Sequence, residues 1–281
     1  MDETQRIAYL KAMGIDIWVP RTDGTRSMNS PAPSFEKEQR CGTQAARCES
    51  AKRSTNVLDR SHVLPDSQTP VPESRAPAEH AQSQSRPIND PSQLDWGALK
   101  QRVSGCTLCG LCNTRTQTVF GVGSRTADWL FIGEAPGADE DRQGKPFVGR
   151  AGQLLNNMLR AIGFSREQVY ITNILKCRPP KNRDPKPEEA HTCEPYLKRQ
   201  IDLLRPKIII ALGRTAAQNL LNTDTPIGRM RGKKYRYADT SIPVLVTYHP
   251  AYLLRSPGEK RKAWQDLLLA QKLVQLKFRK Y

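Results

Sequence analysis

Short apolar runs alternate with segments of helical periodicity from residue 129 to the end of the printed sequence. Runs of four to six residues, rich in Ile, Val, Leu and aromatic side chains, predict buried strands, and the longer segments between them place apolar residues on one helical face. The expected strands are Trp129–Ile132, Val169–Asn173, Lys207–Leu212 and Pro243–Thr247, and the expected helices are Gln153–Ile162, Pro187–Leu204, Ala216–Leu221 and Glu259–Lys277. Strands and helices that alternate in this way predict an α/β fold with a mainly parallel sheet covered on both faces.

The first third of the chain has a different pattern. Residues 21–93 are rich in Ser, Pro, Gln and Arg, and nine prolines lie between positions 20 and 91. Such a segment buries too little apolar surface to offset its chain entropy, so we predict a disordered linker. From Leu94 a short helix leads towards Cys106, and we place the folded domain at residues 94–281.

Residues 1–20 precede this linker and form a short amphipathic segment. Apolar residues recur there at helical spacing, at Ile7, Leu10 and Met13, and Gly14 is followed by a second apolar stretch. The segment is faintly similar to the N-terminal peptide of the clamp-loader ψ subunit of bacteria, over about a dozen residues. That resemblance implies a docking peptide for a replication or repair protein. The alternative is that the segment folds back on the domain.

The positive charge of the chain is confined to the predicted domain. Residues 1–93 contain 12 Lys and Arg and 12 Asp and Glu, so the whole formal net charge of +16 belongs to residues 94–281. A polyanion such as nucleic acid is the expected partner, and a solvated basic surface without a ligand is the alternative. There is neither an apolar stretch of about 20 residues nor a signal peptide. We therefore expect a cytoplasmic protein that does not bind a membrane. We also expect it to be a monomer and to associate with the nucleoid.

Five of the seven cysteines lie between residues 106 and 193. In a reducing compartment, clustered cysteines indicate metal or cluster ligation more often than disulfides. Cys106 and Cys109 form a C-x2-C pair, and Cys177 and Cys193 provide two distant thiols for a four-thiolate site. Cys112 is close enough in sequence to leave the set of four open. Zinc, an iron–sulfur cluster and ordinary buried thiols all remain compatible with this spacing.

Polar residues follow the predicted strands at their carboxyl ends, the edge where α/β sheets bind ligands. Gly133 and Glu134 follow the first strand, Asn173 ends the second, and His249 follows the last. A carboxamide such as that of Asn173 offers a donor and an acceptor side by side and can read the edge of a base. The turn GKPFVGR presents Phe147 as the floor of a pocket for a flat ligand. The alternative for each residue alone is a cap, a turn or a core side chain.

Two basic segments lie near the same edge. Arg178, Lys181 and Arg183 belong to a proline-stiffened loop after Cys177, where cations held at a fixed height can meet phosphates. The segment HPAYLLR forms another loop with an apolar tip and a cation, the combination needed to enter a duplex and extrude a base. A solvated loop and a loop packed on the domain are the respective alternatives.

Together, the motifs GEAPGADED, GKPFVGRAG, VYITNILKCRPPKNR, ALG and HPAYLLR closely resemble the family 4 uracil-DNA glycosylases, over about residues 100–275. The resemblance implies a three-layer sandwich with a four-stranded parallel sheet and the removal of uracil from DNA by hydrolysis of its N-glycosidic bond. It also implies a [4Fe–4S] cluster bound to Cys106, Cys109, Cys177 and Cys193, with Cys112 as a bystander.

The same resemblance implies a role for individual residues. Phe147 stacks on the flipped uracil, Asn173 reads its edge, and His249 hydrogen-bonds uracil O2 as the anion leaves. Glu134, with Gly133 and Ala135, belongs to the water-binding motif. Family 1 enzymes have Asp where this chain has Ala135, so Glu134 either activates water or only positions it. The remaining roles by place in the motif are Leu253 as the wedge and Arg255 near phosphate.

A related branch links covalently to DNA through a His in a loop after the second strand, and residues 176–180 contain no His. We therefore expect simple hydrolysis that leaves an abasic site and no trapped adduct. Two rival functions remain at this point. One is an iron–sulfur accessory protein that binds DNA without excising a base. The other is a zinc-bound hydrolase of free nucleotides.

Overall fold

The computed structural model describes residues 3–12, 14 and 90–278. The predicted linker falls outside the described residues as far as position 89, and the apolar stretch after Gly14 does so as well. The first described turn of the domain, η1 (Pro91–Gln93), is capped by the Asp90 side chain, which accepts a hydrogen bond from the Ser92 amide. No helix within the described ranges is long and apolar enough to cross a membrane.

A mixed sheet of six strands occupies the centre of the domain, in the order β1-β3-β2-β4-β6-β5. The four predicted strands form its parallel middle: β2 (Trp129–Gly133), β3 (Tyr170–Asn173), β4 (Ile208–Leu212) and β6 (Pro243–Thr247). The expected four-stranded sheet is therefore too small. Two short antiparallel edge strands were missed, β1 (Val122–Gly123) beside β3 and β5 (Lys234–Arg236) beside β6.

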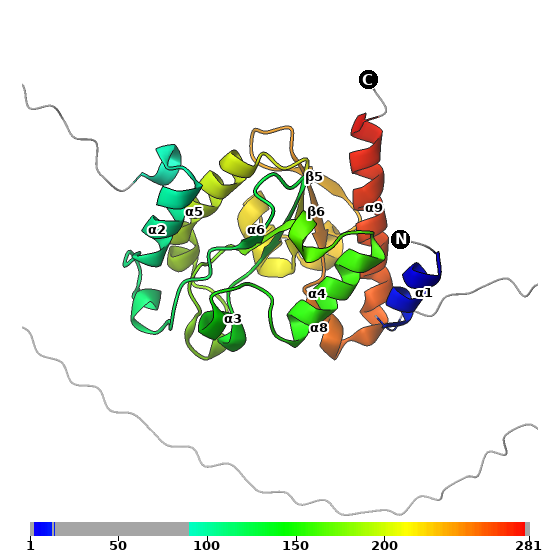
Figure 1. Cartoon of the computed structure of the whole chain (residues 1–281), viewed down its shortest axis with the longest axis horizontal. Coiled ribbons are helices and arrows are strands. Elements are labelled where there is room, and N and C mark those ends of the chain that lie inside the picture. The colour runs from blue at the N-terminus through cyan, green and yellow to red at the C-terminus, as the bar shows by residue number, and fades with distance from the viewer. Residues whose placement is uncertain (1–2, 13, 15–89, 279–281) are drawn as a thin grey trace, which may run out of the picture. The chain divides into compact units, whose positions relative to one another are not determined.

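Helices cover both faces of this sheet (Figure 1). Side chains that alternate along each strand divide the core into two clusters, one on each face. One cluster joins the strands to α4 (Arg150–Ala161), α8 (Pro250–Arg255) and α9 (Lys260–Phe278). The other joins them to α5 (Pro187–Leu204), α6 (Arg214–Leu221) and α7 (Ile227–Met230). The predicted α/β sandwich is confirmed in this coarser form.

A third cluster lies outside the sheet and packs α2 (Trp96–Ser104) against α5, with Cys177 and Cys193 among its buried residues. The turn η2 (Gly110–Asn113) follows α2, and α3 (Ala138–Gln143) follows β2. The remaining short turns are η3 (Arg166–Gln168), η4 (Pro180–Asn182) and η5 (Pro257–Glu259).

The predicted amphipathic segment forms α1 (Glu3–Ala12), which packs against α4. Its Leu10 side chain is 3% exposed and belongs to the same core cluster as α4 and α9. A helix that buries an apolar residue in this way contributes to the core of the domain. Whether it also docks a partner stays a prediction.

Candidate active site

The carboxyl ends of four parallel strands converge on one edge of the sheet. Gly133 at the end of β2 lies beside Asn173 at the end of β3, and the Gly213 amide after β4 donates to the Thr247 carbonyl of β6 at 2.8 Å. A Cβ on Gly213 would lie 2.9 Å from the Cβ of His249, so these two strand ends touch. This crowding brings residues that are far apart in sequence into one site.

Phe147, Asn173 and His249, which the sequence predicts to line a slot for a base, lie close together at this edge. A Cβ on Gly133 would lie 2.4 Å from Asn173 Oδ1 and 2.6 Å from Phe147 Cζ. The rings of Phe147 and His249 are 5.5 Å apart with an interplanar angle of 32°. An aromatic ring and an amide oxygen therefore pack directly against Gly133, and an imidazole lies beside the aromatic ring.

Asn173 is 1% exposed, yet its Oδ1 finds no hydrogen-bond partner among the described residues. A buried amide oxygen left in this way costs about 1–3 kcal/mol unless a ligand or water satisfies it. Its position next to the Phe147 ring suits a planar ligand with an N–H group at its edge.

His249 is the N-cap of α8, a short helix where the sequence suggested only a loop. Its Nδ1 accepts a hydrogen bond from the Ala251 amide at 3.1 Å, which assigns the ring proton to Nε2. Burial, assisted by the Arg255 cation and opposed by Glu140, lowers the pKa of His249 from 6.5 to about 4. The imidazole is therefore neutral at physiological pH and acts as a donor through Nε2.

Glu134 leaves β2 towards the start of α6. Burial raises the pKa of its carboxyl group above the ordinary value, and a hydrogen bond from the Thr215 side chain opposes that shift. Asp184 raises this pKa further, whereas Arg214 lowers it. The next side chain, Ala135, packs against the cluster that contains Cys177 and Cys193, so its methyl group serves the core.

Four of the five clustered cysteines line one partly open pocket with about 300 Å³ of empty space: Cys106, Cys109, Cys177 and Cys193. Cys112 is not among the lining residues. Burial raises the pKa of the Cys177 thiol, and it raises that of Cys193 to about 12. The structure thus gathers the four predicted thiols and leaves the fifth aside.

Hydrogen-bond donors surround the sulfur atoms of this pocket. Arg115 Nη1 donates to Cys177 Sγ at 3.1 Å, and the Lys176 amide donates to Cys193 Sγ at 3.4 Å. Within the described residues, no group of three or more His, Cys, Asp or Glu side chains could hold a single metal ion. The four thiols are therefore spread around the pocket wall.

The basic loop after Cys177 is fixed by its own hydrogen bonds. Arg178 Nε donates to Asn182 Oδ1 at 2.8 Å, and Lys181 is exposed with a left-handed backbone, φ 54°. Arg183 instead forms a bidentate pair with Glu189 of α5, at 2.6 and 2.9 Å. The guanidinium group of Arg183 therefore ties the loop to α5, and its predicted contact with phosphate stays a prediction.

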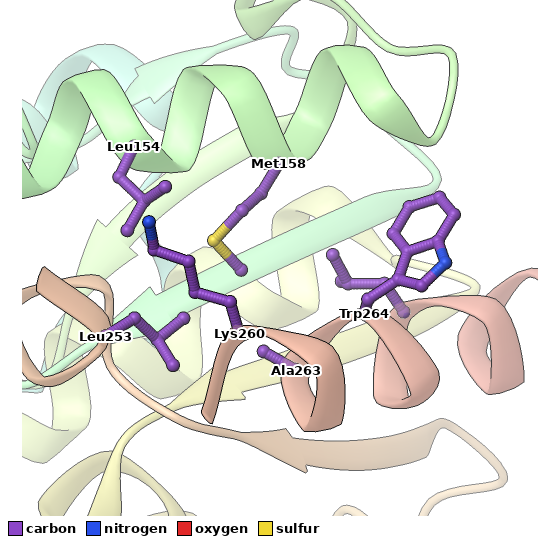
Figure 2. A pocket seen from close by; sticks show the side chains of 7 residues that line it. Leu154, Met158, Leu253, Lys260, Ala263 and Trp264 are labelled. Carbon is purple, nitrogen blue, oxygen red and sulfur yellow. The ribbon is translucent and has the colours of Figure 1, made fainter. Parts of the chain in front are cut away.

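The predicted wedge residue Leu253 faces the interior. It is 1% exposed and lies among Leu154 and Met158 of α4 and the first turns of α9 (Figure 2). A side chain buried in this way cannot enter a duplex, so the prediction does not fit this structure. Tyr252, the preceding residue, is 37% exposed, and Arg255 at the end of α8 is exposed, whereas its predicted place near phosphate stays a prediction.

Sequence reasoning missed several residues that support the site. Thr215 reaches Glu134, Arg115 reaches Cys177, and the buried pair of Lys176 and Gln200 lies behind Asn173. Only Lys176 carried a usable signal, as a cation inside the apolar stretch Ile174–Cys177. The other three depend on contacts between distant elements.

Comparison with known proteins decides the family. The family model of the uracil DNA glycosylase superfamily matches residues 120–268, more than half of the chain. The chain belongs to the uracil-DNA glycosylase superfamily. Within it, the chain is 50% identical over 174 residues to the type-4 uracil-DNA glycosylase of Archaeoglobus fulgidus, an alignment that covers 60% of this chain and 87% of that enzyme.

Two further type-4 uracil-DNA glycosylases match to a similar extent. That of Sulfurisphaera tokodaii is 43% identical over 183 residues, which covers 63% of this chain and 83% of the relative. That of Saccharolobus solfataricus is 45% identical over 175 residues, covering 60% and 81%. The predicted resemblance to family 4 of this superfamily is confirmed.

Proposed function

We propose that this protein is a uracil-DNA glycosylase that flips uracil out of DNA and hydrolyses its N-glycosidic bond to leave an abasic site. The observation that carries this proposal is Asn173 Oδ1, which has no hydrogen-bond partner in the described part of the chain and is buried beside the Phe147 ring, near a neutral His249. Membership of the superfamily supports the same activity.

Asn173 selects the base. Its Oδ1 accepts from the N3–H of uracil, and its amide NH₂ donates to O4 of the same edge. Cytosine presents the opposite pattern at those two atoms, so it leaves the buried amide unpaired. Phe147 offers a flat face for stacking, which is worth about 1–3 kcal/mol per base. Both residues recognise an extruded base and have no use on an intact duplex.

His249 stabilises the leaving group. As the glycosidic bond breaks, negative charge develops on the uracil ring, and a neutral imidazole donates Nε2–H to uracil O2. Because the low pKa of His249 keeps the ring neutral, its Nε2–H group can donate without any change in the protonation or orientation of the ring. The hydrogen bond that fixes Nδ1 to the Ala251 amide holds the tautomer required for this role.

Glu134 acts on the attacking water, whereas His249 acts on the leaving uracil. Burial raises the pKa of Glu134, which makes its carboxylate a stronger base, and a hydrogen bond from Thr215 orients that carboxylate. Ala135 stands where family 1 enzymes have an acidic residue. Glu134 therefore either activates the water or only positions it, together with the backbone of Gly133.

The four thiols that line one pocket fit a [4Fe–4S] cluster held by Cys106, Cys109, Cys177 and Cys193. Each cysteine binds a different iron atom in such a cluster, which suits thiols spread around a pocket wall better than a single tetrahedral ion does. When bound, the cluster supplies a cross-link between the segment after α2 and the segment that carries Asn173. The N–H groups of Arg115 and Lys176 support the sulfur ligands.

DNA binding completes the proposal. Lys181 and Arg255 provide exposed cations on the loops around the site, and Arg178 stiffens the loop that carries Lys181. Tyr252 replaces Leu253 as the exposed apolar side chain of α8. We also keep the expectation that residues 1–20 recruit the enzyme to a replication or repair protein near the chromosome.

A direct assay tests the enzyme. Purified full-length protein is incubated with an oligonucleotide that contains one uracil, and the product is treated with alkali. We expect strand scission only after alkali and no stable protein–DNA band. Intact strands with iron-loaded protein would refute the enzyme and favour a DNA-binding accessory protein.

Asn173→Asp separates recognition from DNA binding. The carboxylate cannot donate to uracil O4, and a site built for a hydrogen bond rejects a mismatch by about 10⁴-fold. We expect excision to fall by about that factor, with unchanged affinity for uracil-free DNA. Asn222→Asp, the same chemical change at the exposed end of α6, is the control and should retain full activity.

A further inference from the structure

Lys176 is a cation in the interior of the domain, 1% exposed, between the end of β3 and Cys177. Its ammonium group donates three hydrogen bonds, at 2.7 Å to Thr172 Oγ1, 2.8 Å to the Asn173 carbonyl and 2.6 Å to Gln200 Oε1. An ammonium group has three N–H donors, so all of them are satisfied. All three acceptors are neutral, so none of them balances the charge.

The charge of Lys176 also has no carboxylate beside it among the described residues. The ionisable groups that act on this ammonium are the thiols of Cys193 and Cys177. Lys176 lines the same pocket as these thiols, and its amide donates to Cys193 Sγ. A buried charge is expensive unless an opposite charge is near, and among the described residues the ligated thiolates of Cys177 and Cys193 are the groups that can provide one.

The same ammonium group holds the residue proposed to read uracil. It binds the Asn173 carbonyl directly, while Gln200 Nε2 and Thr172 Oγ1 both donate to the Phe120 carbonyl at 2.9 Å. The end of β3 is therefore fixed from behind by a closed network. A shift in this network would move the Asn173 side chain, which lies against Gly133 on the other side.

We propose that Lys176 is a positioning residue that serves as counter-charge to the thiolate pocket and links that pocket to Asn173. The inference rests on the proposed function, because it takes the four thiolates as cluster ligands and Asn173 as the base reader. It provides a route by which the thiolate pocket affects base recognition. Loss of the thiolate charge would leave the ammonium unbalanced at the back of the reader.

Lys176→Met tests both parts of the proposal, the counter-charge to the thiolates and the link to Asn173. Methionine keeps an unbranched apolar chain and removes the charge and the three donors. In the full-length protein we expect a lower midpoint potential of the cluster, because a nearby cation favours the reduced form. We also expect about tenfold weaker binding of an oligonucleotide whose uracil has a non-hydrolysable glycosidic bond. Lys198→Met, at an exposed lysine of α5 paired with Glu194, is the control and should change neither value.

Gln200→Glu tests the charge alone and serves if Lys176→Met does not fold. The new carboxylate neutralises the ammonium and still accepts its hydrogen bond, but it loses the Nε2 donor to the Phe120 carbonyl, so uracil binding is not its readout. We expect a lower midpoint potential. An unchanged potential in Gln200→Glu would overturn the counter-charge.

The outcomes for the wild-type protein keep this inference apart from the proposed function. If wild type contains iron and excises uracil, but Lys176→Met matches Lys198→Met in potential and uracil binding, this inference alone is overturned. If purified wild type lacks both iron and the absorption band near about 400 nm, the cluster proposal falls and this inference falls with it.

Discussion

Gly133→Ala would place a methyl group between the base reader and the floor of the slot. The new Cβ would lie 2.4 Å from Asn173 Oδ1 and 2.6 Å from Phe147 Cζ, whereas ordinary van der Waals contact begins at 3.4 Å. The amide oxygen must therefore move by about 1 Å and the ring edge by about 0.8 Å, the differences between these distances. Both are groups that we propose to contact uracil.

The expected loss follows from this displacement. Misplacement by about 1 Å at a reacting centre costs on the order of 100-fold in rate, so we expect kcat/KM for uracil excision to fall about 100-fold. That factor corresponds to about 2.7 kcal/mol of transition-state stabilisation. The cost to folding is of similar size, about 1–3 kcal/mol, because two side chains leave their preferred rotamers at about 0.5–1.5 kcal/mol each.

The assay is excision from a single-uracil oligonucleotide under kcat/KM conditions, with thermal unfolding and affinity for uracil-free DNA measured on the same preparation. Gly228→Ala in α7 is the matched control, because its new Cβ meets no atom within 4 Å. A folded Gly133→Ala enzyme that excises uracil within about threefold of wild type would refute the proposal that Asn173 and Phe147 contact uracil beside Gly133.

Three further predictions concern the same site. The low pKa of His249 predicts excision that is constant from about pH 8 to about pH 5 and falls as the ring protonates near its pKa of about 4. The unfolded chain binds this proton at its ordinary pKa of 6.5. The contribution of His249 to the free energy of unfolding is therefore complete above pH 6.5, and about 3 kcal/mol of it is lost as the pH falls to about 4. His249→Gln should remove this part of the pH dependence of stability when the protein is titrated with acid. Phe147→Leu, which keeps apolar volume but loses the flat face, should lower kcat/KM about tenfold, and an unchanged value would exclude stacking. Arg183→Ala should weaken DNA binding without changing its salt slope, because the guanidinium group pairs with Glu189 and holds the loop; a slope reduced by about 1 would show that Arg183 contacts phosphate.

The carboxyl-end residues were predictable from the sequence, because parallel strands end at the same edge of a sheet. Once the apolar runs before Gly133, Asn173 and His249 are strands, topology alone brings these residues together. The four thiols were predictable for a similar reason. Cys177 follows β3 and Cys193 lies in α5, and both face the segment after α2 in one compact cluster.

Side-chain direction was not predictable in short elements. Helix α8 has only six residues, too few for a periodicity that would assign Leu253 to the core and Tyr252 to the surface. The partner of Arg183 depends on how the chain turns into α5, which presents Glu189 to both the guanidinium group and the Lys186 amide. The edge strands β1 and β5 have two and three residues, so their assignment rests on pairing with longer neighbours.

The floor of the slot is held in a conformation that its own sequence disfavours. Phe147 has φ 52°, a left-handed backbone that costs a bulky residue about 1–3 kcal/mol. Two acceptor contacts fix the turn after it, since Glu140 Oε1 accepts from the Val148 and Gly149 amides at 2.9 and 3.1 Å.

The turn is fixed on its other sides as well. Arg166 donates to the Pro146 carbonyl, and the Phe147 carbonyl lies where a Cβ on residue 152 would stand, 1.8 Å away, so that position requires Gly152. These contacts come from α3, η3 and α4, so the protein itself supplies all of them. The free-energy cost of the strained Phe147 backbone is therefore offset when the protein folds. We expect uracil to stack on a ring that is already in position.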